Sequence, residues 1–398
     1  MRKIVYLVCC VFLYGCAATM QSHLNDIQNN FANGNFQSTT ESMASDQNNL
    51  DLLINGTALF LDDKYAESDS VFEEFNKRHL SETGGSITRE ATGLLFGQSV
   101  NSYKPYMMDS LFVSYYQIWD LLAMNDWKNA RVIINQSYQR QQDMSREYKK
   151  MIENNKQEIT TDSQIAEFID KNSKDWLAFR DIMNPALMYL SGIYFLNDGD
   201  FDNATTYLKR ANGMMPDNKY IKQDLELAQQ KIHPTNTTWK FIETGFAPRL
   251  REENASLYLF NIGLIQFTFS EAYLMPNHTT PQNAEMLANV DALFMTEYNE
   301  YRVNEILRAY TAAVSKTTAQ AMLYNSNSDY APLLGIMSSI YTASSSNADV
   351  RTWATLPKYI YIERYKNTDK TNNLIYNREI NGKIVNIKNI NLTKGEHK

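Results

Sequence analysis

The 398-residue chain has few cysteines, prolines, glycines and histidines. Its three cysteines, Cys9, Cys10 and Cys16, all lie in the first sixteen residues, so the chain beyond them has no thiol for a disulfide, a metal site or catalysis. With 15 Gly and 9 Pro, collagen-like and low-complexity classes are excluded. The five histidines lack the spacing of a zinc motif such as HExxH, and GxSxG, Walker and GxGxxG motifs are absent. The sequence therefore predicts no cofactor and no metal site.

What the chain does have is an ordinary globular composition. Hydrophobic residues make up 43% and charged residues 21%, which is enough buried-type residue for one large or two medium domains. The net charge of -7 argues against a nucleic-acid partner. The charge is uneven: residues 41–75 carry nine acidic and one basic residue, whereas residues 358–398 carry nine basic and four acidic residues. The acidic region could steer a basic partner, and the basic one could contact anionic lipid or glycan or stay solvated.

The first sixteen residues resemble the export signal of a bacterial lipoprotein. Arg2 and Lys3 precede Ile4–Leu13, an apolar run half as long as the ~20 residues of a membrane-spanning helix. The run ends in Leu13-Tyr14-Gly15-Cys16, which resembles a lipobox. We therefore expect a signal peptide over 1–15 and lipidation of Cys16; the alternative is a plain secretory signal.

Lipidation of Cys16 would decide where the protein resides. Two or three acyl chains give stable membrane attachment, which a single chain does not. Ala17 follows the cysteine in place of the Asp typical of inner-membrane retention, so we expect the outer membrane with the body facing the periplasm. Residues 16–32 are polar and predict a lipidated tether that merges into the first helix.

One stretch, residues 192–216, matches the pattern of a tetratricopeptide unit of roughly 34 residues. The small residues Gly192 and Ala204 would let two helices approach closely. Phe201 and Leu208 would fill the seam between these helices. The pattern predicts a helical hairpin with a turn just before Phe201.

Weaker copies of this hairpin can be aligned on the large aromatic residue after the turn. The four anchors are Phe36, Tyr65, Trp127 and Phe201. They are separated by 29, 62 and 74 residues, so insertions such as the 140–180 segment must interrupt a regular array. We predict an irregular tetratricopeptide-like α-solenoid over 33–232; the alternative is a set of unrelated helical hairpins.

After His233-Pro234 the pattern changes to a smaller α+β portion over 235–365. Segments rich in β-branched and aromatic residues predict strands at Trp239–Ile242, Leu257–Phe269 and Trp353–Tyr365. Helical spacing returns over Asp291–Leu323. Residues 366–398 read as a polar basic tail with a hairpin at Asn381-Gly382.

Three segments carry a family resemblance: Val100–Tyr106 running into Phe112–Tyr116, then Asn184–Gly192, then Ala348–Pro357. In this order, behind a lipobox, they resemble a family of tetratricopeptide-containing bacterial lipoproteins of unassigned function. The resemblance covers roughly residues 45–365, with departures at Thr352, where Ser is expected, and in the polar tail. It implies location and architecture but brings no catalytic residues.

Two clusters are candidates for a binding site. The first is aromatic and would form part of a partner groove: Tyr103, Tyr106, Tyr115, Tyr116 and Trp119. The same helical spacing also suits a buried core. The second is Asp349, Arg351 and Trp353, which would either bind an anion or form a structural join with Arg351 paired to Asp349.

Two functional classes follow from these features. The first is a non-catalytic scaffold whose stacked helix pairs bind a protein partner of the cell envelope, with regulation of an envelope-assembly or peptidoglycan-synthesis complex as one role. The second is an envelope hydrolase or transferase with its site in 235–365. Glu297, Arg302 and Glu305 would supply that site, although they also fit the polar face of one helix.

Overall fold

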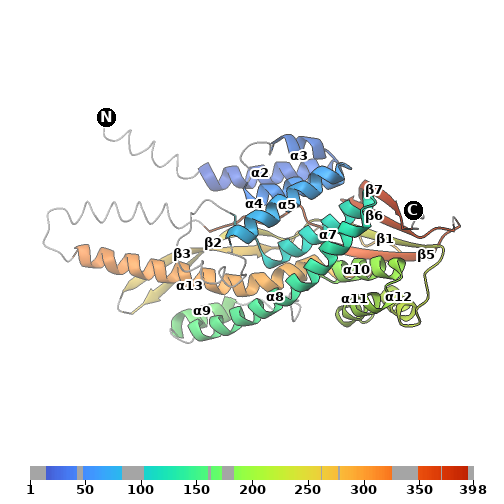
Figure 1. Cartoon of the computed structure of the whole chain (residues 1–398). Coiled ribbons are helices and arrows are strands. Elements are labelled where there is room, and N and C mark those ends of the chain that lie inside the picture. Colours follow the sequence, from blue (N-terminus) through green and yellow to red (C-terminus); the bar gives the residue numbers. More distant parts are fainter. Residues whose placement is uncertain are drawn as a thin grey trace.

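The computed structural model describes residues 15–42, 48–82, 103–159, 163–172, 183–260, 262–276, 278–324, 348–368 and 370–392. The predicted signal peptide lies outside these residues except for Gly15, and so do residues 100–102 and the end of the tail. The described chain is mainly helical with a smaller C-terminal α+β portion, as expected (Figure 1). The molecule is elongated, with the five-stranded sheet toward one end.

Most of the chain up to residue 230 is helical. The helices are α2 (Gly15–Ala32), α3 (Phe36–Ser42), α4 (Asn49–Leu61), α5 (Tyr65–Glu82), α7 (Met107–Ala123), α8 (Trp127–Ile159), α9 (Ser163–Asn172), α10 (Pro185–Asp198), α11 (Phe201–Met214) and α12 (Lys219–Gln229). Three hairpins, α4/α5, α7/α8 and α10/α11, pack side by side, and α3 follows α2 in a shorter one. The insertion predicted within 140–180 is the continuation of α8 together with α9.

The four predicted hairpins share one turn. Each predicted aromatic anchor is the first residue of a helix: Phe36, Tyr65, Trp127 and Phe201. Two positions earlier the backbone is left-handed, with φ between 59° and 81°, at Gly34, Asp63, Asn125 and Gly199. The residue between donates its N–H to the carbonyl five residues back, at 2.8–3.0 Å, which satisfies the end of the preceding helix. The predicted order of turn and aromatic residue is therefore confirmed.

The small residues Gly192 and Ala204, predicted to lie between two closely packed helices, are buried, and the other hairpins have small residues at the matching positions. Three positions after each anchor lies a fully buried small side chain: Thr39, Ser68, Ala130 and Ala204. Gly192 allows Leu208 to approach so closely that a Cβ would lie 2.6 Å from its Cγ. Gly56 occupies the equivalent position in α4 and faces Phe72. A Cβ at residue 56 would lie 2.5 Å from Cε1 of Phe72. Glycine is required at both sites because the facing side chain occupies the space of a Cβ.

The α+β portion contributes a five-stranded mixed sheet with the order β4-β5-β1-β6-β7. Its strands are β1 (Thr237–Thr244), β4 (Glu285–Asn289), β5 (Tyr359–Lys366), β6 (Asn373–Ile380) and β7 (Lys383–Asn391). Central β1 runs antiparallel to β5 and parallel to β6. The predicted hairpin at Asn381-Gly382 is confirmed, with both residues left-handed. However, residues 373–391 form two of the five strands of the sheet rather than a tail.

Two strand predictions need correction. The segment Leu257–Phe269 is not one strand, because β2 (Arg249–Leu259) turns into β3 (Gly263–Tyr273) within it. Both arms have apolar residues at alternate positions, so the turn is hidden in the pattern. The strand predicted from Trp353 begins only at Tyr359. The predicted helix over Asp291–Leu323 is confirmed as α13 (Val290–Tyr324), which packs on β3.

The inner helices α4, α7 and α10 are covered by the sheet. Trp119 of α7 meets Phe241 of β1 and Tyr376 of β6, each with ring centroids 5.4 Å apart. Phe60 of α4 meets Tyr376 at 4.9 Å. One hydrophobic core therefore extends across the predicted boundary near residue 235, and it reaches from Leu24 to Leu392. Leu24, Ile27 and Phe31 of the predicted tether belong to this core as part of α2.

Candidate functional site

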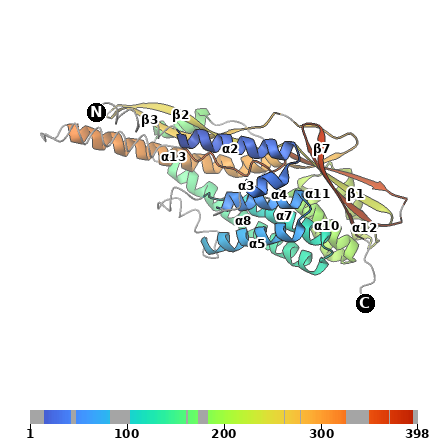
Figure 2. The same cartoon turned by 90° about the horizontal axis from the view of Figure 1, so that it is seen from above.

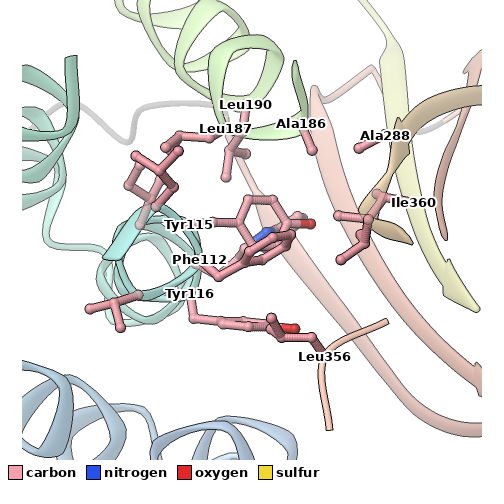
Figure 3. Close-up of a cluster of buried hydrophobic side chains, with 14 of the residues drawn as sticks. Phe112, Tyr115, Tyr116, Ala186, Leu187, Leu190, Ala288, Leu356 and Ile360 are labelled. Carbon is pink, nitrogen blue, oxygen red and sulfur yellow. The ribbon is translucent and has the colours of Figure 1, made fainter. Parts of the chain in front are cut away.

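The predicted aromatic groove is not a groove. Tyr103, Tyr106, Tyr115, Tyr116 and Trp119 are between 0% and 6% exposed. Tyr115 and Tyr116 point from α7 toward Leu356 and Ile360 on the sheet side, as Figure 3 shows. Tyr115, Tyr116 and Trp119 belong to the core between the inner helices and the sheet, and Tyr106 packs against Phe294 and Tyr301 of α13. A partner therefore cannot reach these rings.

A buried ionic cluster fixes α7 to the sheet behind these rings. The hydroxyls of Tyr116 and Tyr376 donate to Glu243 Oε2 at 3.1 and 2.7 Å, and Arg378 Nη1 lies 3.3 Å from the same oxygen. Burial raises the pKa of Glu243, while Arg378 and the tyrosines oppose the shift. Because Glu243 and Arg378 are at most 1% exposed, the cluster is closed to substrates and has a structural role.

The start of α7 is held by two carboxylates. Asp109 accepts from the Tyr103 hydroxyl at 2.7 Å and from the Tyr106 N–H at 2.9 Å. Glu297 of α13 accepts from the N–H groups of Met107 and Met108 at 2.7 and 3.1 Å. These N–H groups have no partner inside the helix, and the positive end of the helix dipole favours a negative charge there. Glu297 therefore attaches α13 to the first turn of α7.

The other residues of the hypothetical enzyme site are also held in structural bonds. Arg302 is buried against Glu271, with Nε 2.7 Å from the carboxylate. Glu305 accepts from the Ser270 N–H at 3.0 Å, and burial raises its pKa. Glu297, Arg302 and Glu305 therefore hold α13 to α7 and β3, and the enzyme alternative stays a prediction.

The cluster of Asp349, Arg351 and Trp353 is a structural join. Arg351 Nε and Nη2 bond Asp349 at 2.8 and 2.7 Å. Trp353 is 2% exposed and packs beside Phe72 and Tyr116. The pairing predicted from the sequence is confirmed, and the anion-binding alternative has no support.

A groove that was not predicted from the sequence lies on the outer side of the α7/α8 hairpin. It encloses about 400 Å³ between α5, α7 and α8. Its apolar lining is Leu121, Val132 and Ile133, and its polar lining is Asp69, Glu73, Asn76, Lys77, Gln117, Asn129, Gln136 and Arg140. This volume is within the range of small-ligand and peptide-side-chain pockets.

Gln117 forms the floor of the groove. This α7 residue is 1% exposed, and its Nε2 donates to Asp69 Oδ1 at 2.8 Å while its Oε1 accepts from Asn76 at 3.1 Å. Burial raises the pKa of Asp69, Gln117 opposes the shift, and Glu73 and Asp126 add to it. Lys77 also lines this side, 3.7 Å from Glu73, so the α5 side of the groove carries two carboxyl groups and one ammonium.

Arg140 supplies the opposite charge from α8. Its Nη1 donates to Ser114 Oγ at 3.0 Å and to the Ser110 carbonyl at 3.3 Å. Within the described residues it has no carboxylate partner. Burial lowers its pKa, and burial together with Arg140 lowers the pKa of nearby His79 to about 4. A half-buried guanidinium bonded only to neutral oxygens retains donors for an anionic group.

One signal in the sequence could have pointed to this groove. The run from Phe112 to Ala123 is almost entirely apolar, yet it contains Ser114, Gln117 and Asp120. Buried polar groups require hydrogen-bond partners, so polar residues on such a helix indicate a specific network. The hydrogen-bond partners of these three residues lie on α5 and α8. The sequence alone gives no indication that these two helices pack beside α7 at these positions.

The acidic and basic regions of the chain meet in the fold. The side chain of Lys388 in β7 is 1% exposed and pairs with Asp63 in the turn between α4 and α5, a separation of 325 residues. Its ammonium also lies over the rings of Phe60 and Tyr65, at 4.7 and 4.9 Å. Part of the basic region is therefore bonded to the α4/α5 hairpin, and Lys388 is not available to contact lipid or glycan.

The described residues also bear on membrane spans, metal sites and the predicted anchor. Among the described helices, none has the length and apolar character needed to cross a membrane. No group of three or more His, Cys, Asp and Glu side chains in the described ranges is arranged as metal ligands. Cys16 lies in the first turn of α2, and its lipidation stays a prediction.

Comparison with protein-family models, curated proteins and solved structures finds no match to this chain.

Proposed function

We propose that this chain is a lipid-anchored protein of the bacterial cell envelope that acts as a non-catalytic adaptor. In this proposal Cys16 holds it at the outer membrane, and divergent tetratricopeptide hairpins present a site for an envelope protein partner. The shared turn and the buried small residues of the hairpins support the repeat assignment. Regulation of envelope assembly or of peptidoglycan synthesis is the role such an adaptor would serve.

The partner site is the groove of α5, α7 and α8. Open arrays of helix pairs bind partners on their concave inner face. Here that face is filled by the sheet of the same chain, since α4, α7 and α10 are buried on nearly every side. An adaptor of this design has to use its outer helices, and the groove there combines polar and apolar lining.

Arg140 is the observation that carries the proposal. Its remaining donors fit a carboxylate, and Asp69 across the groove fits a basic group, whereas Glu73 is paired with Lys77. Val132, which is 45% exposed, and Leu121 offer apolar contact between the two charged sides. The complementary ligand is an extended peptide segment with an acidic and a basic side chain around an apolar one.

Site-specific photo-crosslinking in the native envelope tests this site. A photoreactive residue in place of Gln136, an exposed lining residue, should capture one partner peptide reproducibly. The same residue in place of Lys222, exposed on α12, should not capture it. Arg140→Gln should abolish the crosslink from position 136, whereas Lys128→Gln, which removes the same charge from α8 outside the groove, should leave it intact. Equal capture from both positions, or an unchanged crosslink in Arg140→Gln, would exclude the groove as the partner site.

The anchor needs a separate test. Cys16→Ala should eliminate incorporation of labelled acyl chains and release the protein from the membrane fraction. Unchanged labelling would mean that Cys16 is not the lipidated residue. The enzyme alternative receives no support from Glu297, Arg302 and Glu305, because each is engaged in a structural bond.

A further inference from the structure

The hairpin of β2 and β3 has an outward face whose polarity reverses toward its tip. Near the middle of the hairpin, cross-strand neighbours on this face are polar, such as Asn254 with Thr268 and Ser256 with Gln266. The next outward pair is Tyr258 with Leu264, which are 69% and 59% exposed. Phe260 follows at the tip and is 90% exposed. In a hairpin that faces water throughout, the outward positions would stay polar to the end.

The exposed side chains are not needed to hold the hairpin in place. Its inward face already packs through Leu259, Ile265 and Phe267 against Ile306 and Tyr310 of α13. Tyr258, Phe260 and Leu264 lie on the other side of the strands, away from this cluster. An apolar group of this kind, left exposed at the end of an arm, indicates an interaction surface.

Charge distribution narrows the kind of partner. Residues 254–270 contain no charged side chain, and residues 309–324 at the end of α13 contain only Lys316. Both segments lie at the same end of the molecule (Figure 1). Protein interfaces usually have a polar or charged rim, whereas a surface that enters the acyl region of a bilayer has to exclude charge.

The position of α2 indicates a membrane. Arg249 at the start of β2 bonds Asn25 in the middle of α2, and from this contact both elements run toward the same end of the molecule (Figures 1 and 2). From Asn25 to Gly15 α2 extends ~15 Å, and from Arg249 to Phe260 the hairpin extends ~35 Å. The tip thus reaches past the start of α2, where Cys16 lies, and α2 does not cover it.

We propose that the tip of this hairpin, Tyr258, Phe260 and Leu264, inserts into the interfacial region of the lipid bilayer as a second membrane contact. The proposal rests on the lipid anchoring of Cys16 only for its choice of membrane. Phe260 lies two positions beyond Tyr258, a reach of ~7 Å, which matches the ~5–10 Å depth of interfacial insertion. The second contact would fix the orientation of the body, which a flexible acyl anchor alone leaves free.

Fluorescence from a single labelled thiol tests the insertion. Because the mature chain has no cysteine except Cys16, and acylation consumes that thiol, Phe260→Cys provides one reactive thiol in the acylated protein. An environment-sensitive NBD label there should shift to the blue with phosphatidylethanolamine–phosphatidylglycerol vesicles, and brominated acyl chains should quench it. The matched control is Ile384→Cys on β7, which is 55% exposed and should show neither effect.

The outcomes separate the insertion from the anchor. If the acylated protein floats with vesicles but the label at position 260 remains water-like, the insertion is wrong and the anchor stands. In the unacylated chain, where Cys16→Ser keeps position 260 the single labelled thiol, the label should still shift when vesicles are added, and a missing shift overturns the insertion. A shift that depends on protein concentration without vesicles would mean that the tip packs on a second copy, which also overturns it.

An affinity measurement gives an independent readout. In the unacylated Cys16→Ser chain, replacing Tyr258, Phe260 and Leu264 together by Ser should weaken vesicle binding roughly tenfold or more, because three exposed apolar side chains are lost. Replacing the outward polar residues Ser256 and Gln266 by Ala should leave binding unchanged. Equal affinity of the tip variant and the unsubstituted chain would contradict the proposal.

Discussion

Gly56 is the position where a single added methyl group tests the packing of the helical hairpins most directly. In α4 a Cβ at residue 56 would lie 2.5, 2.7 and 2.9 Å from three ring atoms of Phe72 in α5. Ordinary carbon–carbon contacts are ~3.5–4.0 Å, so the ring would have to move by ~1 Å. Phe72 is fully buried, and its ring already contacts those of Tyr116 and Trp353. The ring therefore has no free space into which it can move.

The expected effect of Gly56→Ala is the difference between two opposing contributions. Overpacking a well-filled core costs about 1–3 kcal/mol. Alanine stabilises a helix interior over glycine by up to about 1 kcal/mol. The free energy of unfolding should therefore fall by about 1–2 kcal/mol. Gly192→Ala should behave alike, since its Cβ would meet Leu208 at 2.6 Å.

Gly213 supplies the matched control within the same kind of helix. It lies in α11, and a Cβ there would meet nothing within 4 Å. Gly213→Ala should therefore raise the free energy of unfolding by about 0.5 kcal/mol through helix propensity alone. Urea unfolding followed by circular dichroism measures all three variants. If Gly56→Ala is as stable as Gly213→Ala, the close approach of α4 and α5 is wrong.

A double-mutant cycle would show that the loss comes from the Phe72 contact. In the Gly56→Ala background, Phe72→Leu removes the ring atoms that the new methyl group meets. The two substitutions should therefore couple favourably by about 1 kcal/mol relative to the sum of their separate effects. Additive effects would place the cause of the destabilisation elsewhere.

Three further predictions concern the buried charges. Burial raises the pKa of Asp109 from 3.8 to about 7. Between these two pH values the folded state binds more protons than the unfolded state. The free energy of unfolding should therefore fall by up to about 4 kcal/mol as the pH rises from the lower value to the higher one. Asp109→Asn should remove this component, which urea unfolding at pH 4.5 and 8 measures; an unchanged pH dependence would refute it. Asp224 accepts a hydrogen bond from Arg364 at 2.8 Å. Asp224→Ala should lower the free energy of unfolding by about 3–5 kcal/mol. Adding Arg364→Met should restore part of this loss, because it removes the cation that the first substitution leaves unpaired. Glu297→Gln should lower the unfolding free energy by about 1 kcal/mol through its bonds to the α7 N-terminus, and no loss would show that the charge is unimportant there.

The elements that the sequence predicted well are those set by neighbours along the chain. The turns before Tyr65 and Trp127 follow from a left-handed residue and an aromatic residue two positions apart, and the Asn381-Gly382 hairpin follows from its turn residues. The parallel pairing of β1 with β6 joins residues more than 130 positions apart, so no local pattern encodes it. The groove was missed for the same reason, because Gln117, Asp69 and Arg140 come from three different helices.

The inner helices do contain local information about the face that a partner would use. In α4, every residue from Leu52 to Leu61 is buried, and α10 is buried from Pro185 to Leu196. A helix that is apolar all round has to be covered on all sides, whereas the inner helix of an open repeat array keeps one polar face for solvent or ligand. The sequence of α4, with Leu52, Leu53, Ile54, Ala58, Leu59 and Phe60, therefore already argues for a covered inner face. The sheet supplies that cover, and any partner is left with the outer groove and the ends of the molecule.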